Sequence, residues 1–223
     1  MSTELIHTII FAGGYLGLFA LGELLFHFAK VEGELTRKLV HIGTGLICLL
    51  WPIYFTTYWA ILALTSSFLV ILGLSLKFNL LQSINKIDRK SHGSVLYPII
   101  MNLCWLIYLY VEDINYFYLP VLILAISDPV AALVGKRWPI GPYKIIHDTK
   151  SLAGSTAFFL SAVGISCIFL FSTRESHFEI ILIALCVSLV TTLAEAVSQR
   201  GFDNLFIPLS AVVTLYGLDY LLQ

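Results

Sequence analysis

The residue of this chain best placed to do chemistry is an aspartate inside an apolar segment. Asp128 lies in the stretch Ser127-Asp-Pro-Val-Ala-Ala-Leu-Val-Gly-Lys-Arg137. An ionisable side chain at membrane depth is costly and usually marks a site. Lys136 and Arg137 follow it closely, and a carboxylate near several cations can hold a divalent metal and a phosphate chain. The alternative is a structural aspartate that is hydrogen-bonded to a neighbouring helix.

The residues around Asp128 predict an irregular helix. Pro129 disfavours helical geometry at the residue before it. We therefore expect the helix to be broken or kinked there, which would free backbone carbonyls beside the carboxylate. Ser127, Ala131 and Gly135 recur every four residues and form a small-residue face that lets another helix or a ligand come close.

A second lysine opens the next apolar segment. Ser151 is the predicted N-cap of that helix, and Lys150, Gly154 and Ser155 flank it. A helix N-terminus presents free N–H groups to an anion, and Lys150 would add a full charge. This pattern predicts phosphate binding, although the glycine spacing of the Walker loop is absent. Basic residues here could also serve membrane topology alone.

Acidic residues reappear near the end of the chain. Glu195 lies inside an apolar segment, and Asp203 and Asn204 begin the last one. With Asp128, the two acids could share a magnesium ion, which prefers oxygen ligands. Asp203 or Asn204 could instead be only the N-cap of the last helix.

The N-terminal part offers a basic helix entrance, in which Arg37 and His41 share a face. Arg37 and Lys38 could contact phosphate or only anchor lipid headgroups. His41 could accept a proton from an alcohol or make a structural hydrogen bond. Glu23 is open to the same two interpretations.

The composition determines which elements must position these residues. With 58% hydrophobic and 12% charged residues, the chain is typical of an integral membrane protein. We expect one all-α domain over 1–223, a polytopic bundle of about eight spans. Because the second and third meet at a tight connection, seven are possible. The predicted spans are 5–28, 39–55, 56–76, 94–111, 116–135, 152–171, 178–198 and 204–222.

The charges predict the orientation of the bundle. All but one of the 13 basic residues lie on alternate loops, and the opposite loops are acidic apart from Arg174. The positive-inside rule then places the basic loops and the site in the cytosol and both termini outside. The size of the chain favours a bacterial inner membrane. A net charge of −1 argues neither for nor against nucleic acid, and we expect no such partner.

Four of these blocks, in this order, resemble the family of phytol kinases, dolichol kinases and CTP-dependent diacylglycerol or polyprenol kinases. They are Glu34-Leu-Thr-Arg-Lys-Leu-Val-His41, Ser127 to Lys136, Lys150-Ser-Leu-Ala-Gly-Ser155, and Glu195 with Asp203-Asn-Leu-Phe-Ile-Pro208. The resemblance covers most of the chain. It implies that CTP, or a related nucleotide, phosphorylates the hydroxyl of a membrane lipid alcohol. Phytol, farnesol, dolichol, undecaprenol and diacylglycerol all remain possible substrates.

The resemblance also implies roles for individual residues. It assigns Asp128, Lys136, Lys150, Gly154 and Ser155 to the nucleotide site. The metal and phosphate region would be completed by Glu195, Asp203 and Asn204. Mg²⁺, held by Asp128 with Asp203 or Glu195, would bridge the nucleotide phosphates. Lys136 and Lys150 would stabilise charge on the transferring group.

Two alternatives stay open. The middle block is also similar to CDP-diacylglycerol synthases, but their C-terminal His-Gly-Gly…Asp-Arg…Asp signature is missing, which favours the kinase. Against it, Ala153 stands where the kinases often have Glu. An ion-coupled transporter would need inverted repeats and paired broken helices, and the sequence indicates one break, at Asp128-Pro129.

Overall fold

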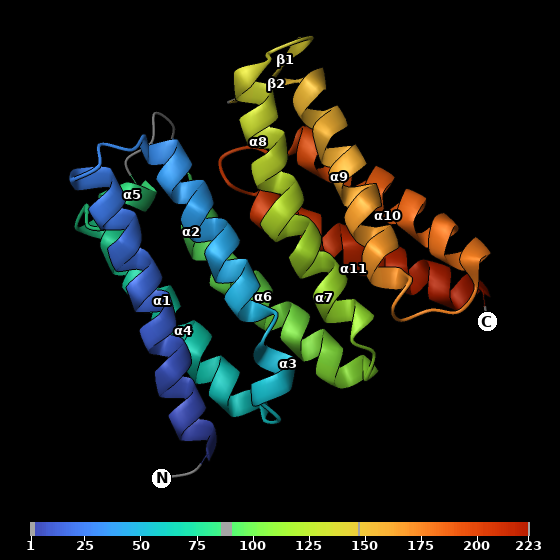
Figure 1. Ribbon diagram of the computed structural model, residues 1–223, viewed down its shortest axis with the longest axis horizontal. Coiled ribbons are helices and arrows are strands. Elements are labelled where there is room, and N and C mark those ends of the chain that lie inside the picture. The colour runs from blue at the N-terminus through green and yellow to red at the C-terminus, as the bar shows by residue number, and fades with distance from the viewer. Residues whose placement is uncertain (1–2, 86–90, 147, 223) are drawn as a thin grey trace.

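The computed structural model describes residues 3–85, 91–146 and 148–222, which form a bundle of antiparallel helices (Figure 1). The long helices are α1 (Thr3–His27), α2 (Gly33–Cys48), α4 (Tyr58–Lys77), α6 (Gly93–Val111), α9 (Leu152–Leu170), α10 (His177–Val197) and α11 (Asp203–Leu222). Between α6 and α9, α7 (Asn115–Leu122), the π-helical segment η1 (Ile123–Ser127) and α8 (Asp128–Arg137) follow one another without a break. The short elements are α3 (Trp51–Tyr54), α5 (Gln82–Asn85) and an antiparallel hairpin of β1 (Pro142–Ile145) and β2 (Asp148–Ser151).

The predicted all-α membrane bundle is confirmed. Seven helices in the described part of the chain are long and apolar enough to cross a membrane, with Asn115–Arg137 as one of them. The structure differs from the prediction in the span that was expected over 39–55. There α2 begins at Gly33 and ends at Cys48, and α3 follows as a separate turn. The start of α2 carries several charges, and this amphipathic helix of 16 residues is not one of the seven.

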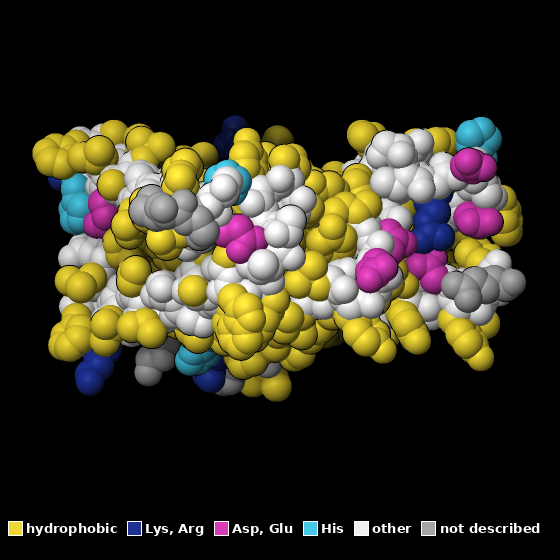
Figure 2. All heavy atoms as spheres, turned by 90° about the horizontal axis from the view of Figure 1, so that it is seen from below, with side chains coloured by type: hydrophobic (Ala, Val, Ile, Leu, Met, Phe, Trp, Pro, Cys, Tyr) yellow, Lys and Arg dark blue, Asp and Glu magenta, His cyan; other side chains and the backbone are white. Residues whose placement is uncertain are grey.

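The two ends of the bundle differ in charge. The hairpin, α5 and the connection from α1 to α2 lie at one end, and both termini lie at helix ends facing away from it (Figure 1). Three of the expected basic loop residues, Lys86, Arg89 and Lys90, lie outside the described residues. Figure 2 views the opposite end, where acidic side chains gather around a small basic patch within a largely hydrophobic outline.

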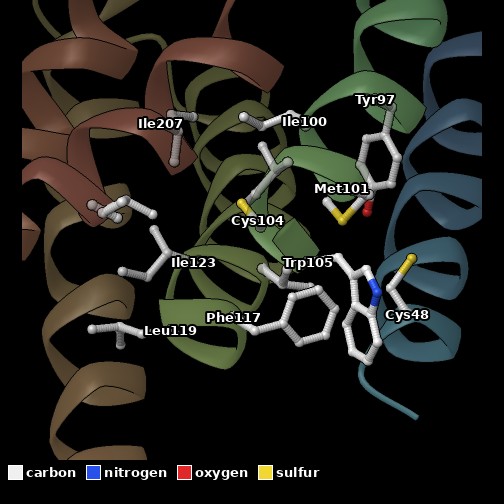
Figure 3. Packing of buried hydrophobic residues seen from close by; sticks show 14 of the residues in the cluster. Cys48, Tyr97, Ile100, Met101, Cys104, Trp105, Phe117, Leu119, Ile123 and Ile207 are labelled. Atoms are coloured by element: carbon white, nitrogen blue, oxygen red, sulfur yellow. The ribbon is translucent and has the colours of Figure 1, made fainter. Parts of the chain in front are cut away.

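An aromatic core joins the two halves of the bundle (Figure 3). Trp51 stacks on Phe117 with ring centroids 5.8 Å apart, and Trp105 packs edge-on against both rings. All three side chains are almost fully buried. Because Trp51 follows α2, Trp105 belongs to α6 and Phe117 to α7, this cluster fixes α2 against the helix that carries Asp128.

The helix was expected to break or kink at Asp128-Pro129, but it continues through both residues. Asp128 keeps helical angles of φ −64° and ψ −47°, and the turn before it widens into η1. A proline ring clashes with the carbonyl four residues earlier and offers no N–H. A π-helical turn accommodates this within a continuous helix. As expected, a carbonyl is freed: that of Leu124, which accepts a hydrogen bond from His41 Nε2 at 3.0 Å.

The small-residue face of α8 does allow the close approach that was predicted. A Cβ atom added to Gly154 would lie 2.9 Å from the carbonyl oxygen of Ala131 and 3.3 Å from the Cα of Gly135. The backbones of α8 and α9 therefore touch, and this contact holds Asp128 and the start of α9 at fixed positions.

Candidate functional site

A polar cavity of about 750 Å³ opens at the hairpin end of the bundle. Residues of α2, α8, the hairpin, α9 and the adjoining ends of α10 and α11 line it. Nine of the residues predicted from the sequence are among them: Lys38, Asp128, Lys136, Lys150, Ser151, Gly154, Ser155, Glu195 and Asp203. Four other predicted residues, Arg37, His41, Arg137 and Asn204, do not line it.

The first element of the cavity is a buried ion pair between α2 and α8. Lys38 Nζ lies 2.6 Å from Asp128 Oδ2, and both residues are at most 7% exposed. A buried charge is tolerated only when a partner compensates it. His41, one turn further along α2, places Nε2 3.8 Å from the same carboxylate oxygen.

The protonation of His41 follows from its main contact. A carbonyl oxygen can only accept, so the contact with Leu124 requires a hydrogen on Nε2. In the neutral ring, Nδ1 is then the atom that can take a proton. His41 thus holds η1 against α2 beside Asp128.

A second lysine–carboxylate pair lies on the other wall. Lys150 Nζ contacts both the side chain and the backbone carbonyl of Glu195. The strand register pairs Lys150 with Tyr143, so both side chains leave the same face of the hairpin. Tyr143 Oη lies 2.7 Å from Ser155 Oγ, which donates to the other Glu195 oxygen at 3.4 Å.

The start of α9 differs from the expected anion site. Ser151 is its N-cap, as predicted, and its Oγ accepts the N–H of Gly154 at 3.1 Å. The preceding N–H groups of Leu152 and Ala153 donate to the carbonyls of Gly141 and Ile140. The backbone groups expected to be free for a phosphate are therefore engaged, and Lys150 supplies the positive charge at this point.

The remaining basic candidates lie outside the centre of the cavity. Lys136, at its rim, forms an exposed ion pair with Glu32. Arg137 is exposed and outside it. Arg37 donates to Ser91 Oγ at 2.9 Å.

At the start of α11, Asp203 and Asn204 face different neighbours. Asp203 lines the cavity and accepts the N–H of Asn204 on Oδ1 at 2.9 Å. The Asn204 amide donates to the Gly93 carbonyl at 2.8 Å and so joins α11 to the start of α6. Glu23 has a structural contact: its Oε1 accepts the Ser83 N–H at the start of α5.

The donor set around the cavity fits magnesium in type. Asp128, Glu195 and Asp203 supply the oxygen atoms that Mg²⁺ prefers. In the described part of the chain, no group of three His, Cys, Asp or Glu side chains stands close enough to form a complete metal site. Mg²⁺ commonly takes only one or two carboxylates and obtains its other ligands from water and substrate phosphates.

Sequence reasoning missed the hairpin and two residues that contact side chains of the site, Glu32 and Tyr143. Strands of four residues are too short for a periodic signal, so 138–155 read as a loop. Tyr143, which lies in this stretch, was therefore not considered, and neither was Glu32, which immediately precedes α2. The alternation of burial along Pro142–Ile145 and Asp148–Ser151 is visible only in the structure.

Comparisons with known proteins support the resemblance. The chain is 28% identical over 213 residues to a phytol kinase of Synechocystis, covering 94% of this chain and 91% of that protein. It is 30% identical over 202 residues to a probable chloroplastic phytol kinase 3 of Glycine max, covering 82% of this chain and 62% of the relative. An uncharacterized Rickettsia prowazekii protein is 38% identical over 101 residues, 45% of this chain and 48% of its own length.

No family model matches the chain, and no solved structure is similar to it. The match to the Synechocystis protein spans nearly the full length of both chains. The chain is therefore similar to phytol kinases, in one case over nearly its full length.

Proposed function

We propose that this protein transfers a phosphoryl group from CTP to the hydroxyl of a membrane lipid alcohol of the phytol type. The observation that carries the proposal is the pair of lysine–carboxylate contacts, Lys38 with Asp128 and Lys150 with Glu195, on facing walls of one cavity. The relatives named phytol kinase support the same chemistry.

The two lysines are the cations that would meet the triphosphate. Lys38 is buried, Lys150 is 13% exposed, and each is held by a carboxylate, so neither can leave its partner without another anion to take its place. A triphosphate entering between them would supply that anion. Lys136 at the rim and Arg137 next to it in the chain would attract the nucleotide from solution, because their charges are exposed.

The transfer itself needs one proton acceptor. The alcohol oxygen would form a bond to the γ-phosphorus while the bond from that phosphorus to the β-bridging oxygen breaks, leaving CDP. The hydroxyl proton would pass to the Asp128 carboxylate, which loses Lys38 to the phosphate. His41 holds the Leu124 carbonyl through its Nε2 hydrogen and so orients Asp128.

A bound Mg²⁺ would neutralise charge on the phosphates during transfer. Asp203 and Glu195 are the residues that would hold it. Glu195 becomes available when Lys150 turns to the phosphate. Phosphoryl transfer depends mainly on such positioning and charge stabilisation.

We further propose that the hairpin end faces the cytosol, where the nucleotide is found. The described basic residues other than Arg174 belong to segments at this end, as the positive-inside rule requires. In a bacterial cell this would be the inner face of the inner membrane. Accessibility of a cysteine placed at exposed Ile146 to a membrane-impermeant thiol reagent, in inside-out and right-side-out vesicles, tests this orientation.

The activity is tested with purified protein, labelled CTP, Mg²⁺ and a panel of lipid alcohols. The expected products are a labelled lipid phosphate and CDP. Release of pyrophosphate with a CDP-lipid would instead identify a cytidylyltransferase and overturn the proposal. Asp128→Asn should abolish turnover. Asp219→Asn, a paired acid at the opposite end of the bundle, is the matched control and should retain turnover.

A further inference from the structure

Two residues predicted for the nucleotide site, Arg37 and Asn204, lie outside the polar cavity and meet at the start of α6. A Cβ atom added to Gly93, the first residue of α6, would lie 2.6 Å from Arg37 Nη2 and 2.9 Å from Asn204 Nδ2. Arg37 belongs to α2 and Asn204 to α11, so helices far apart in the sequence meet at one glycine. We call this meeting point, formed by Arg37, Ser91, Gly93, Gly201 and Asn204, the junction.

Hydrogen bonds hold the junction together. Arg37 Nη2 donates to Ser91 Oγ at 2.9 Å, and the same oxygen accepts the Gly93 N–H at 3.2 Å. The Asn204 amide donates to the Gly93 carbonyl at 2.8 Å. Arg37 Nη1 is buried and has no hydrogen-bond partner among the described residues, so the bond to Ser91 is what orients the guanidinium. Both side chains therefore bind the protein itself and not a ligand in the cavity.

Glycine is required where the backbones of this region cross. Gly201, in the turn between α10 and α11, has a φ of +86°, in the left-handed region that favours glycine. A Cβ atom there would also clash with the backbone nitrogen of Gly93 and with Ser91 Oγ. The turn and the start of α6 are therefore in direct contact, and a side chain at Gly201 would separate them.

The same turn is also bound to the hairpin. The Arg200 N–H donates to Asp148 Oδ2 at 2.8 Å, and the Arg200 carbonyl accepts the His92 N–H at 2.8 Å. Asp148 belongs to β2, and His92 directly precedes α6. The turn that leads into Asp203 is therefore held between the hairpin and α6.

The junction lies directly behind two residues of the polar cavity. Lys38 follows Arg37 on α2, Asp203 precedes Asn204 on α11, and both Lys38 and Asp203 line the cavity. Adjacent residues of a helix project about 100° apart, so each pair places one side chain in the cavity and the other in the junction. The Asn204 N–H also donates to Asp203 Oδ1 at 2.9 Å, whereas Asp203 Oδ2 accepts no hydrogen bond from the described residues.

We propose that Arg37 and Asn204 are positioning residues that act through Asp203 on Mg²⁺. They bind the start of α11 to α6 and α2, and this fixes where the Asp203 carboxylate stands in the cavity. The inference rests on the proposed function, in which Asp203 holds the metal. Replacing a residue that orients a metal ligand without touching the metal typically lowers metal affinity by about 10- to 100-fold. A junction that only fastened helices would affect stability and leave metal affinity unchanged.

Two asparagine variants separate these roles. Asn204→Ala removes the bond to Gly93. Asn102→Ala, the matched control, removes a bond of the same kind between α6 and α4, in which Asn102 Nδ2 donates to Thr65 Oγ1 at 2.7 Å. Both variants should lower the melting temperature in detergent. Only Asn204→Ala should raise the Kd for Mn²⁺, by about tenfold or more, as measured by electron paramagnetic resonance without alcohol or nucleotide. An Mn²⁺ Kd that is the same in both variants would overturn the proposal.

A second variant remains decisive if Asn204→Ala does not fold. Ser91→Ala removes the acceptor of Arg37 and leaves the Asn204 bond in place, and Ser67→Ala, at an exposed position of α4, is its control. Ser91→Ala should raise the Mn²⁺ Kd by about fivefold or more, the scale of one lost hydrogen bond, and Ser67→Ala should not. Equal Kd values for these two variants would also overturn the proposal.

The metal measurement is independent of turnover, so the two proposals can fail separately. Weakened Mn²⁺ binding in Asn204→Ala, with no alcohol phosphorylated by the wild-type protein, would support the junction and contradict the proposed kinase activity. Phosphorylation of an alcohol by the wild-type protein, with the same Mn²⁺ Kd in Asn204→Ala and Asn102→Ala, would leave the kinase in place and reduce the junction to a structural contact.

Discussion

The two ends of this bundle both contain buried acid–base contacts, but they are built differently. At the end away from the hairpin, Arg174 Nη2 lies 2.8 and 3.0 Å from the two Asp219 oxygens, and Tyr116 donates to the same carboxylate at 2.8 Å. These residues join the start of α7 to the ends of α9 and α11. At the hairpin end, Lys38–Asp128 and Lys150–Glu195 line opposite walls of a cavity.

This difference distinguishes a structural ion-pair network from a binding site. The Arg174 network has one cation shared by acids from several elements, and a tyrosine completes it. The cavity has two separate pairs, each of which can exchange its partner for an incoming ion. Buried or partly buried charges therefore carry different meaning, depending on whether they face each other alone or face a shared space.

Removing one acid from each end of the bundle should give the largest difference in kcat between two variants. Asp128→Asn should lower kcat by roughly 10²-fold or more, the usual contribution of a positioned proton acceptor. Asp219→Asn should lower the melting temperature in detergent and leave kcat within about twofold of wild type, because its partners are structural. Radiolabelled lipid phosphate and thermal unfolding provide the two measurements. An Asp128→Asn enzyme with normal kcat would remove Asp128 from the mechanism.

At the Lys150–Glu195 pair, a single and a double variant separate the contribution of the lysine charge to activity from its contribution to stability. Lys150→Met leaves Glu195 buried without its cation, which should cost about 3 kcal/mol of stability. Lys150→Met with Glu195→Gln should regain most of that stability but no activity, since the phosphate contact stays lost. Lys144→Met, on the exposed face of the same hairpin, is the control and should change neither. Recovery of activity in the double variant would show that Lys150 is only structural.

Arg174→Gln should have a purely structural effect. Its side chain is 19% exposed, so solvent screens part of the interaction. A loss of about 1–2 kcal/mol is expected, less than for a fully buried pair. The KM values for nucleotide and alcohol should not change. A raised KM would mean that this end of the bundle is coupled to the cavity.

The last comparison concerns two glycines of α9, one of which should give the smallest effect. Gly154→Ala would place a Cβ 2.9 Å from the Ala131 carbonyl, so α8 and α9 must separate, at a cost of about 1–3 kcal/mol. Activity should fall as well, because α8 carries Asp128. In contrast, nothing lies within 4 Å of a Cβ added at Gly164. Gly164→Ala should stabilise the helix by about 0.5–1 kcal/mol with unchanged activity. Equal behaviour of the two variants would contradict the close helix contact.

The sequence alone determined the membrane bundle, because length and hydropathy of a span are local properties. The predicted spans agree with the helices to within a few residues, apart from the stretch that became α2 and α3. The sequence also identified Asp128, Lys150, Glu195 and Asp203 as unusual, since polar residues in apolar segments stand out one by one.

Only the tertiary structure decided how these residues are paired. Lys38 and Asp128 are 90 positions apart, and Lys150 and Glu195 are 45 apart. Such contacts depend on how helices pack, which no local pattern encodes. The same holds for η1, where a widened turn, and not a break, accommodates both the fixed Pro129 ring and the His41 contact. It holds also for the hairpin, whose register aims Lys150 into the cavity and Lys144 away from it.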